Sequence, residues 1–401
     1  MTEQHSARPD VHTPVTLLTG FLGSGKTTLL NRALRDPAMA RTMIVVNEFG
    51  EISIDHALTQ VSNDSIVVLE NGCLCCTVFG DLVQTFNQLW LAREAGEIAF
   101  DHVVIETSGL AEPAPVLQAF LSQPLLAGLW RVGAVVTTVD AINGPHTLDQ
   151  HPVSVAQAAL ADHLLITKLD LLEPGERDSA RAALTARLRT INATASISAV
   201  DDPSADPMRL LRSVGPDPGG GPESAAAWLA HALGGRGEGA GGEGGHAHEP
   251  EGHGHEGHDE HEGHGHEGHA HAAPASHAHE DAISTFNLIR ETPLPREAVQ
   301  LLLSSLERHL GPKLLRVKGL IHVAEEPEQP AVIQGAQHLL HNLTWLPRWP
   351  DADRRTRIVF ITQGIAPDEL SEMVNLLDRV AQRTAAARAR AATPPEAGVP
   401  Q

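Results

Sequence analysis

The sequence predicts an α/β domain built on a mostly parallel sheet, followed by a smaller α+β domain. Two observations support this fold class. From residue 13 to about residue 200, short apolar runs alternate with helix-like patterns. After a long interruption rich in Gly, Pro and His, a second folded unit of about 100 residues begins near Ile283.

Seven apolar runs are the expected strands of the first domain. Several consist almost entirely of Val, Ile and Leu, as expected of strands that helices cover on both faces. The runs are residues 15–20, 43–47, 65–70, 102–106, 132–140, 163–167 and 196–200. Helical patterns lie between them, for example over residues 26–35 and 175–190. This alternation predicts a parallel sheet with helices on both faces.

Composition divides the chain into four segments. We expect a first domain over residues 13–212, a Gly/Pro- and His-rich disordered linker over 213–282, a second domain over 283–383 and a disordered tail over 384–401. Within the linker, residues 246–279 hold half of the 24 histidines and almost no apolar side chains. Burial in such a segment cannot offset the entropy lost on ordering.

The second domain is predicted to be a small α+β unit. Its first helical pattern is entered through Pro295, and proline suits the start of a helix. The expected elements are strand 283–289, helix 295–310, strands 313–323 and 355–362, and helix 366–382.

Composition also limits the function classes. The formal charge of −21 disfavours a nucleic-acid partner, because phosphate binding needs clustered Lys and Arg. The N-terminus holds no apolar signal-peptide run, and no stretch approaches the roughly 18 apolar residues of a membrane span. We therefore expect a soluble, cytoplasmic protein with no membrane partner.

The strongest motif is "GFLGSGKT", residues 20–27, which matches the phosphate-binding pattern G-x-x-x-x-G-K-[ST] in full. It follows an expected strand directly and opens a helix, so backbone N–H groups can converge on phosphate oxygens. Lys26 would reach the outer phosphates, and the Thr27 hydroxyl would hold Mg²⁺. The first domain is thus predicted to be a P-loop NTPase. The predicted nucleotide-binding residues of the loop are Gly20, Gly23, Ser24, Gly25, Lys26, Thr27 and Thr28.

A second motif, "HVVIETSG", covers residues 102–109 and ends its buried strand in Glu106. P-loop folds place the carboxylate that supports Mg²⁺, directly or through water, at such a strand end. Glu106 therefore joins Lys26 and Thr27 as a predicted catalytic residue, and Gly109 would donate its N–H near the terminal phosphate. The alternative is a glutamate that only caps a helix.

A third motif, "ITKLD", covers residues 166–170 and follows the sixth strand. An [N/T]-K-x-D sequence in this place reads guanine. Asp170 would accept from the N1–H and the exocyclic amine, which adenine cannot supply, and the Lys168 stem would pack over the ring. Thr167 stands where Asn is commoner. The alternative is a polar strand-to-helix turn. Residues 196–200 are a weaker candidate for the loop that closes over the base.

All three cysteines lie within four positions, at Cys73, Cys75 and Cys76. Three clustered thiols do not make a disulfide framework. Thiolates prefer Zn²⁺, Cu⁺ and similar soft ions, and three of them leave one tetrahedral position open. An incomplete ligand set suits an ion that must be released. Buried packing and redox chemistry are the alternatives.

The loop "NEFGEISIDH", residues 47–56, is the natural place for a segment that responds to nucleotide. Glu48, Asp55 and His56 are weaker candidates for further metal ligands, with ordinary loop residues as the alternative. The histidines of residues 246–279 can bind transition metals at many degenerate sites, which favours metal scavenging over catalysis.

Together these motifs resemble the CobW-type metal-insertion GTPases. The matching pieces are "GFLGSGKTTLLN", "VVNEFGEISIDH", "ENGCLCC", "VIETSGLAEP" and "TKLD". The second unit, with "RVKGLIHV", "VIQGAQHLLH" and "WPDADRRTRIVFI", looks like the C-terminal domain of that family. The resemblance implies GTP hydrolysis, a metal held at the cysteine motif, and transfer of that metal to a client protein.

The predicted function is a GTP-hydrolysing metallochaperone that uses Mg²⁺ with GTP. It would bind Zn²⁺ first, or Co²⁺ second, at Cys73, Cys75 and Cys76, and deliver the ion to a client under control of the nucleotide. A homodimer is a candidate assembly. One alternative is a metal store or sensor with a regulatory nucleotide site. Another is an ATP-dependent kinase or transport ATPase, against which the guanine motif argues.

Overall fold

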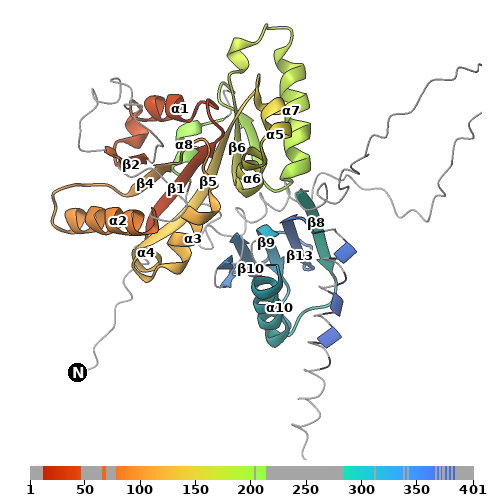
Figure 1. The fold of residues 1–401 in the computed structure, drawn as a ribbon. Helices are drawn as coiled ribbons and strands as arrows, with labels where there is room; N and C mark the ends of the chain where they lie inside the picture. The colour runs from red at the N-terminus through yellow and green to blue at the C-terminus, as the bar shows by residue number, and fades with distance from the viewer. Residues whose placement is uncertain are drawn as a thin grey trace, which may run out of the picture.

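The chain folds into two units, seen in a computed structural model (Figure 1). The first is a parallel sheet covered by helices, and the second is a smaller antiparallel sheet with one long helix. Within the described residues, no helix is long and apolar enough to cross a membrane. The structure describes residues 12–46, 66–68, 78–202, 205–213, 283–310, 313–336, 339–340 and 343–365, and several positions between 368 and 383.

The sheet of the first unit has the strand order β3-β2-β4-β1-β5-β6-β7, and each pairing is parallel. Neighbouring parallel strands need long crossover connections, and most of these contain a helix. The predicted parallel α/β fold is confirmed. Its strands are β1 (Thr13–Gly20), β2 (Thr42–Val46), β3 (Ile66–Val68), β4 (His102–Glu106), β5 (Trp130–Asp140), β6 (His163–Thr167) and β7 (Ser196–Ala199).

Helices cover both faces of this sheet because its strands are apolar on both sides (Figure 1). In β1, Leu17 packs toward α2, α3 and α4, whereas Leu18 packs toward α1 and α8. In β4, Ile105 and Val104 divide in the same way. The helices are α1 (Lys26–Ala33), α2 (Val78–Glu94), α3 (Ala114–Ser122), α4 (Pro124–Leu129), α5 (Gly144–Gln150), α6 (Pro152–Leu160), α7 (Arg177–Ile191) and α8 (Pro207–Leu211).

The second unit is an antiparallel sheet in the order β11-β10-β9-β13-β8, with β12 paired to β10. Helix α10 (Arg296–His309) covers one face, where Val299 and Leu306 share a core with Val317 and Phe360. The strands are β8 (Ile283–Arg290), β9 (Leu314–Ile321), β10 (Ala331–Ala336), β11 (Leu339–Leu340), β12 (Thr344–Trp345) and β13 (Thr356–Gln363).

A buried ionic cluster joins the two units. Asp162, just before β6, bonds to Arg316 and Lys318 of β9, and the Arg316 guanidinium also donates to the Leu160 carbonyl oxygen at 2.6 Å. Burial raises the pKa of the Asp162 carboxyl, but the attraction of the two cations outweighs it, so the pKa lies below its ordinary value. Losing one partner of such a cluster typically costs about 3–5 kcal/mol.

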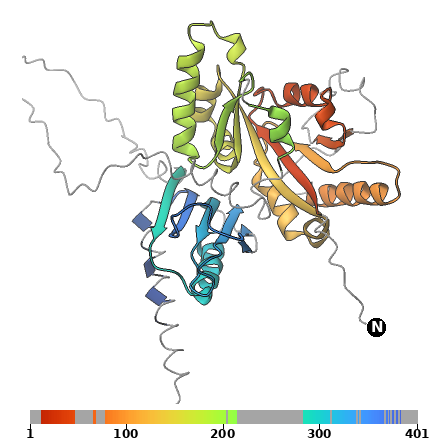
Figure 2. The same cartoon turned by 180° about the vertical axis from the view of Figure 1, so that it is seen from behind.

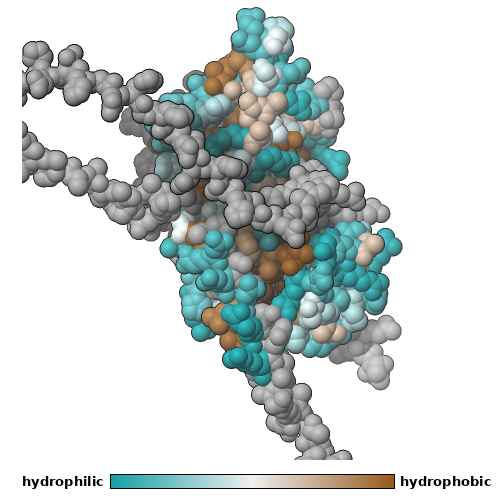
Figure 3. Space-filling model, turned by 90° about the vertical axis from the view of Figure 1, so that its right-hand side faces the viewer, coloured by the Kyte–Doolittle hydropathy of each residue, from teal (hydrophilic) through white to brown (hydrophobic). Residues whose placement is uncertain are grey.

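Apolar packing continues across the same junction. Leu315 and Ile361 of the second unit share a core with residues of α6 and α7. Figure 2 shows the second unit lying beneath the lower ends of α6 and α7, and in Figure 3 hydrophobic surface gathers near the junction on an otherwise mostly hydrophilic face. The two units are therefore packed against each other through a shared hydrophobic core.

Most predicted elements are present with small shifts of their ends. The strands predicted at 102–106 and 163–167 are observed with those bounds, whereas the run at 65–70 is described as strand only over Ile66–Val68. Every position described between 368 and 383 is helical, as predicted. The predicted linker lies outside the described residues from position 214 onward, as does the tail.

Candidate functional site

The predicted nucleotide motifs meet at one edge of the first sheet. Strands β4, β1, β5 and β6 are consecutive neighbours and run in parallel, so their carboxyl ends lie side by side. The phosphate loop leaves β1, Glu106 ends β4, and Thr167 ends β6. Ligands in open α/β sheets bind outside the carboxyl ends of the strands, so this edge is the candidate site.

The loop starts at a glycine that no other residue can replace without displacement. Gly20 has a φ of 139°, and a Cβ there would lie 2.4 Å from the Thr138 Oγ1 atom. One turn on, the Ser24 hydroxyl is 2.7 Å from the same Thr138 oxygen. Gly20 and Ser24 thus press the loop against the end of β5, which fixes its backbone before any ligand arrives.

Helix α1 begins at Lys26, inside the phosphate-loop motif. Its N-cap, Gly25, supplies no side-chain hydrogen bond. The first turn of any helix has N–H groups without partners inside the helix, and these bind phosphate readily. Lys26 is buried, and its Nζ atom donates to the carbonyl oxygens of Gly20 and Phe21 at 2.9 and 3.2 Å. The lysine is therefore folded over the loop, within the turn that phosphates would occupy.

Thr27 and Glu106 form the candidate magnesium site. The Thr27 hydroxyl donates to the Glu106 Oε1 atom at 2.9 Å. Glu106 is 5% exposed at the end of β4, whereas Thr27 and Thr28 are exposed at the start of α1. Hydroxyl and carboxylate oxygens are the ligands that Mg²⁺ prefers, so this pair fits the ion. The structure brings together the two residues predicted for this role.

Gly109 lies against the phosphate loop. A Cβ at Gly109 would be 2.7 Å from the Leu22 nitrogen and 2.6 Å from the Leu22 Cα atom. The segment between Glu106 and Gly109 is also tied to β1, because the Thr107 N–H donates to the Leu18 carbonyl oxygen at 3.0 Å. Only glycine fits here, and it keeps the segment in contact with the loop.

Thr167 and Lys168 brace the loop from the other side. The Thr167 hydroxyl donates to the Ser24 carbonyl oxygen at 2.7 Å. Lys168 has a φ of 61°, a left-handed conformation that costs a non-glycine residue of order 1 kcal/mol. Its Nζ atom reaches the Asp140 Oδ2 atom at 2.7 Å. Strain of this kind collects at functional sites.

Asp140 is a site residue that the sequence motifs do not identify. Burial raises the pKa of its carboxyl, but the hydrogen bonds from Lys168, from the Asn143 side chain and from the N–H groups of Ile142 and Asn143 outweigh it, so the pKa lies below its usual range. The carboxylate stays ionised and holds Lys168 in place. Asp140 is the last residue of the apolar run 132–140. An acid at the end of a predicted strand is the sequence signal that could have identified it.

Asp170 lies at the edge of the site. It is exposed in a short 3-10 turn, Leu169–Leu171, and its carbonyl oxygen accepts from Arg177 at 2.8 Å. This bond uses the backbone oxygen and not the side chain, and the residue is exposed, so a ligand can reach Asp170. Residues 196–200 are the weaker candidate for the loop over the base, but residues 196–199 form strand β7, paired with β6, and only Val200 lies in the turn that follows.

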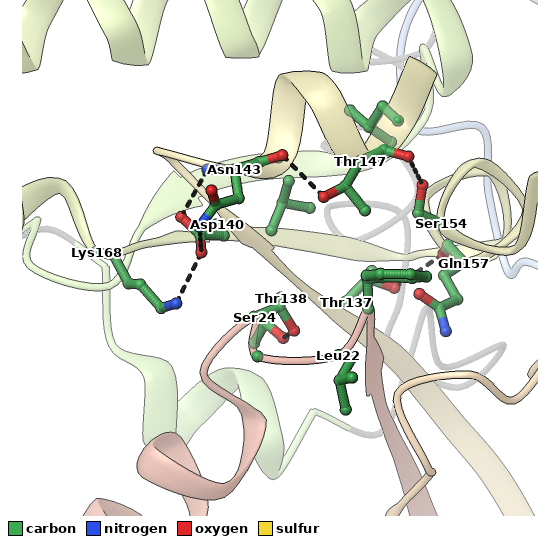
Figure 4. A pocket seen from close by; sticks show the side chains of 15 residues that line it. Leu22, Ser24, Thr137, Thr138, Asp140, Asn143, Thr147, Ser154, Gln157 and Lys168 are labelled. Atoms are coloured by element: carbon green, nitrogen blue, oxygen red, sulfur yellow. Dashed lines mark hydrogen bonds and ion pairs between the residues drawn. The ribbon is translucent and has the colours of Figure 1, made fainter. Parts of the chain in front are cut away.

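A pocket of about 170 Å³ opens beside the loop (Figure 4). Its volume is below the roughly 300–1,000 Å³ of ordinary ligand pockets, so it fits a small group or part of a nucleotide. Phe21 stacks on His151 with ring centroids 4.6 Å apart, beside the pocket. The pocket is lined by residues 21–24 of the loop, residues 137–140 of β5, Asn143, Gly144, Thr147, Leu148, Ser154, Gln157 and Lys168.

The predicted metal ligands lie outside the described residues. These are Cys73, Cys75 and Cys76, with Glu48, Asp55 and His56. In the part of the chain that the structure describes, no group of three or more His, Cys, Asp or Glu side chains could hold a metal ion. The cysteine motif falls between the two described elements β3 and α2, and β3 belongs to the sheet whose carboxyl edge carries the phosphate loop.

Two protein-family descriptions match this chain. The description "CobW/HypB/UreG, nucleotide-binding domain" matches residues 14–199, and "Cobalamin synthesis protein cobW C-terminal domain" matches residues 283–377. The chain belongs to the CobW family. The predicted resemblance is confirmed, and the two matches fall on the two folded units.

Named relatives of this CobW-family protein include the zinc chaperone YjiA of Escherichia coli (strain K12). It is 28% identical over 359 residues, which cover 89% of this chain and 96% of YjiA. The zinc-regulated GTPase metalloprotein activator 1 of Schizosaccharomyces pombe is 35% identical over 166 residues, 40% of this chain and 39% of that protein. The crystal structure of Zn(II)-bound YjiA GTPase from E. coli matches with a TM-score of 0.58 at 25% identity, over 92% of this chain and 99% of that one.

The Thr27–Glu106 pair generates a direct prediction. Replacing Glu106 with Gln keeps the side-chain volume but removes the charge that would support Mg²⁺. We expect the Mg²⁺ concentration for half-maximal GTP turnover to rise about 10–100-fold, as for other supporting ligands of a metal. The measurement is a Mg²⁺ titration of GTP hydrolysis. Glu112→Gln, an exposed acid six residues on, is the matched control. An unchanged titration in Glu106→Gln would rule out the assignment.

Proposed function

We propose that this chain is a GTP-hydrolysing metallochaperone that carries zinc to a client protein. The observation that carries the nucleotide half is the complete phosphate loop, with Thr27 bonded to Glu106 at the shared strand edge. The names of its relatives support both halves, since YjiA is named a zinc chaperone and a GTPase. The GTPase domain is assigned to residues 13–212 and the C-terminal domain to residues 283–383.

GTP would bind with its phosphates in the turn of the loop. The N–H groups of the first turn of α1 face the β- and γ-phosphates, and Lys26 exchanges its two carbonyl contacts for phosphate oxygens. Gly109 presents its N–H to the terminal phosphate. Asp170 selects guanine by accepting from N1–H and the exocyclic amine, while Lys168, braced by Asp140, packs over the ring.

Hydrolysis depends on positioning and charge. The transferred phosphoryl group gains little from covalent chemistry, so the barrier falls chiefly through donors that are already fixed in place. Bound Mg²⁺ would neutralise charge that develops on the phosphates. Thr27 and Glu106 would hold that ion, and Lys26 would stabilise the outer phosphates. The bonds Ser24–Thr138 and Thr167–Ser24 keep the loop from reorganising during the reaction.

The metal is the cargo of this cycle. Cys73, Cys75 and Cys76 supply three thiolates for Zn²⁺, with Co²⁺ as the second choice, and leave the fourth position for exchange. Glu48, Asp55 and His56 are further candidate ligands. GTP would order residues 47–56 and draw the thiolates together, and hydrolysis or contact with the client would release the ion. A homodimer that shares one ion is a candidate assembly.

A metal store or sensor is the second candidate function. It is favoured by residues 246–279, whose 12 histidines can bind ions at many degenerate sites. In that case the nucleotide would regulate storage, and steady-state GTP turnover would be low with or without metal. This segment has almost no apolar side chains to contribute to a core, so we expect that deleting it separates the two functions.

Base selection can be tested at Asp170. Replacing Asp170 with Asn removes the charged acceptor and should weaken GTP binding by on the order of 3 kcal/mol, the value of two hydrogen bonds to a charged group. Xanthine nucleotide should gain, because its C2 carbonyl replaces the guanine amine. Competition binding with GTP, XTP and ATP measures this, with Asp178→Asn as the control at an exposed acid of α7. Equal binding of ATP and GTP by the wild type would disprove the guanine assignment.

The metal site can be tested at Cys75 in a protein that lacks residues 246–279, so that the histidines do not compete. Replacing Cys75 with Ser should abolish one tight zinc site per chain, because a neutral hydroxyl is a poor ligand for this ion. GTP binding should remain, since the phosphate loop is intact. Zinc titration against a chelator measures the stoichiometry, with the deletion protein that keeps all three cysteines as the control. A tight site that survives the change would place the cargo elsewhere.

A further inference from the structure

Gln157 of α6 is buried beside the nucleotide site, and no motif accounts for it. It is 0% exposed and lines the pocket next to the phosphate loop (Figure 4). Its Nε2 atom donates to the Gly109 carbonyl oxygen at 3.2 Å and to the Ala111 carbonyl oxygen at 3.0 Å. A buried amide that uses both donors on one short segment holds that segment in place.

The held segment touches the phosphate loop directly. Gly109 lies so close to Leu22 that a Cβ would meet the Leu22 backbone at 2.6–2.7 Å. On its other side, Thr107 bonds to β1 through the Thr19 hydroxyl at 2.9 Å. The turn after Glu106 is therefore clamped between the loop, β1 and the Gln157 amide. Movement of Gly109 by a fraction of an ångström would move its N–H relative to the loop.

Helix α6, which carries Gln157, is itself firmly anchored. The Gln157 carbonyl oxygen accepts from the Thr137 hydroxyl of β5 at 3.0 Å. One turn further on, the Leu160 carbonyl oxygen accepts from Arg316 of the second unit. Helix α6 is therefore held by buried hydrogen bonds to β5 and to the second unit. The Gln157 amide is fixed in place before any nucleotide binds, as a group that positions a catalytic residue must be.

We propose that Gln157 is a positioning residue for GTP hydrolysis: it fixes the Gly109–Ala111 turn so that the Gly109 N–H faces the terminal phosphate. This inference rests on the proposed GTPase function. Gln157 would affect the binding and hydrolysis of GTP but not the binding of GDP, because Gly109 would contact only the terminal phosphate. GDP binding therefore does not depend on it.

Two substitutions test the proposal. Gln157→Leu keeps similar volume and removes both donors, and we expect kcat to fall about 10–100-fold, the range produced by small misplacements of reacting groups. The GDP dissociation constant should stay within about threefold of wild type. A variant that had merely unfolded would lose GDP binding together with kcat. Gln150→Leu makes the same chemical change at an exposed position of α5 and should leave both values unchanged.

The second substitution, Gln157→Glu, has the same shape and adds a pH readout. When protonated, the introduced carboxyl donates one hydrogen bond to a carbonyl oxygen, whereas its ionised form repels both carbonyls. Burial and the facing oxygens raise the pKa of such a carboxyl. The ratio of variant to wild-type kcat should therefore be highest at acidic pH and fall as pH rises.

The outcomes separate this proposal from the function on which it rests. Wild-type protein that binds but does not hydrolyse GTP contradicts the GTPase function itself. If wild type is active, wild-type kcat in Gln157→Leu, or a parallel loss of kcat and GDP affinity, overturns the positioning role. If Gln157→Leu does not fold, the Gln157→Glu ratio decides, and a ratio that is constant with pH overturns the proposal.

Discussion

The parallel pairing of β4, β1, β5 and β6 determines where the residues of the candidate site lie. Once these strands are neighbours with one direction, the ends of all four must lie at one edge. The phosphate loop, Glu106, Asp140 and Thr167 each follow or end one of them. Residues 143 positions apart in the chain therefore come within hydrogen-bonding distance, as the Thr167–Ser24 contact demonstrates.

Rigidity of this edge comes from buried polar contacts. Ser24, Thr138 and Thr167 tie the loop to β5 and β6, and Gln157 ties the turn after Glu106 to α6. Each neutral hydrogen bond contributes only about 0.5–1.5 kcal/mol, but a buried partner left unpaired costs about 1–3 kcal/mol. The arrangement thus favours one loop geometry over others. The ionic cluster of Asp162, Arg316 and Lys318 extends the same rigidity to the second unit.

The parts of the site that sequence predicted are local in the chain. The phosphate loop needs eight consecutive residues, and Glu106 needs only a buried strand that ends in an acid. Gln157 could not be found in this way, because its partners lie 46 and 48 positions away and a glutamine in an Ala-rich helix carries no signal. The pairing of Asp162 with Arg316, 154 positions apart, is invisible to any local pattern for the same reason.

In the proposed cycle, the nucleotide and the metal control one another. The cysteine motif falls in the chain after β3, and the phosphate loop after β1, in the same parallel sheet. If the two sites are coupled, reciprocity requires that each ligand change the affinity of the other by one factor. A static metal site on an independent GTPase predicts no such factor.

The most direct test is calorimetry of Mg²⁺·GTP and Mg²⁺·GDP binding, with and without one equivalent of Zn²⁺, in protein that lacks residues 246–279. We predict that zinc tightens GTP relative to GDP by about 5–150-fold, the usual range of coupling between sites. The same ratio of GTP to GDP affinity with and without zinc would show that the two sites are not coupled.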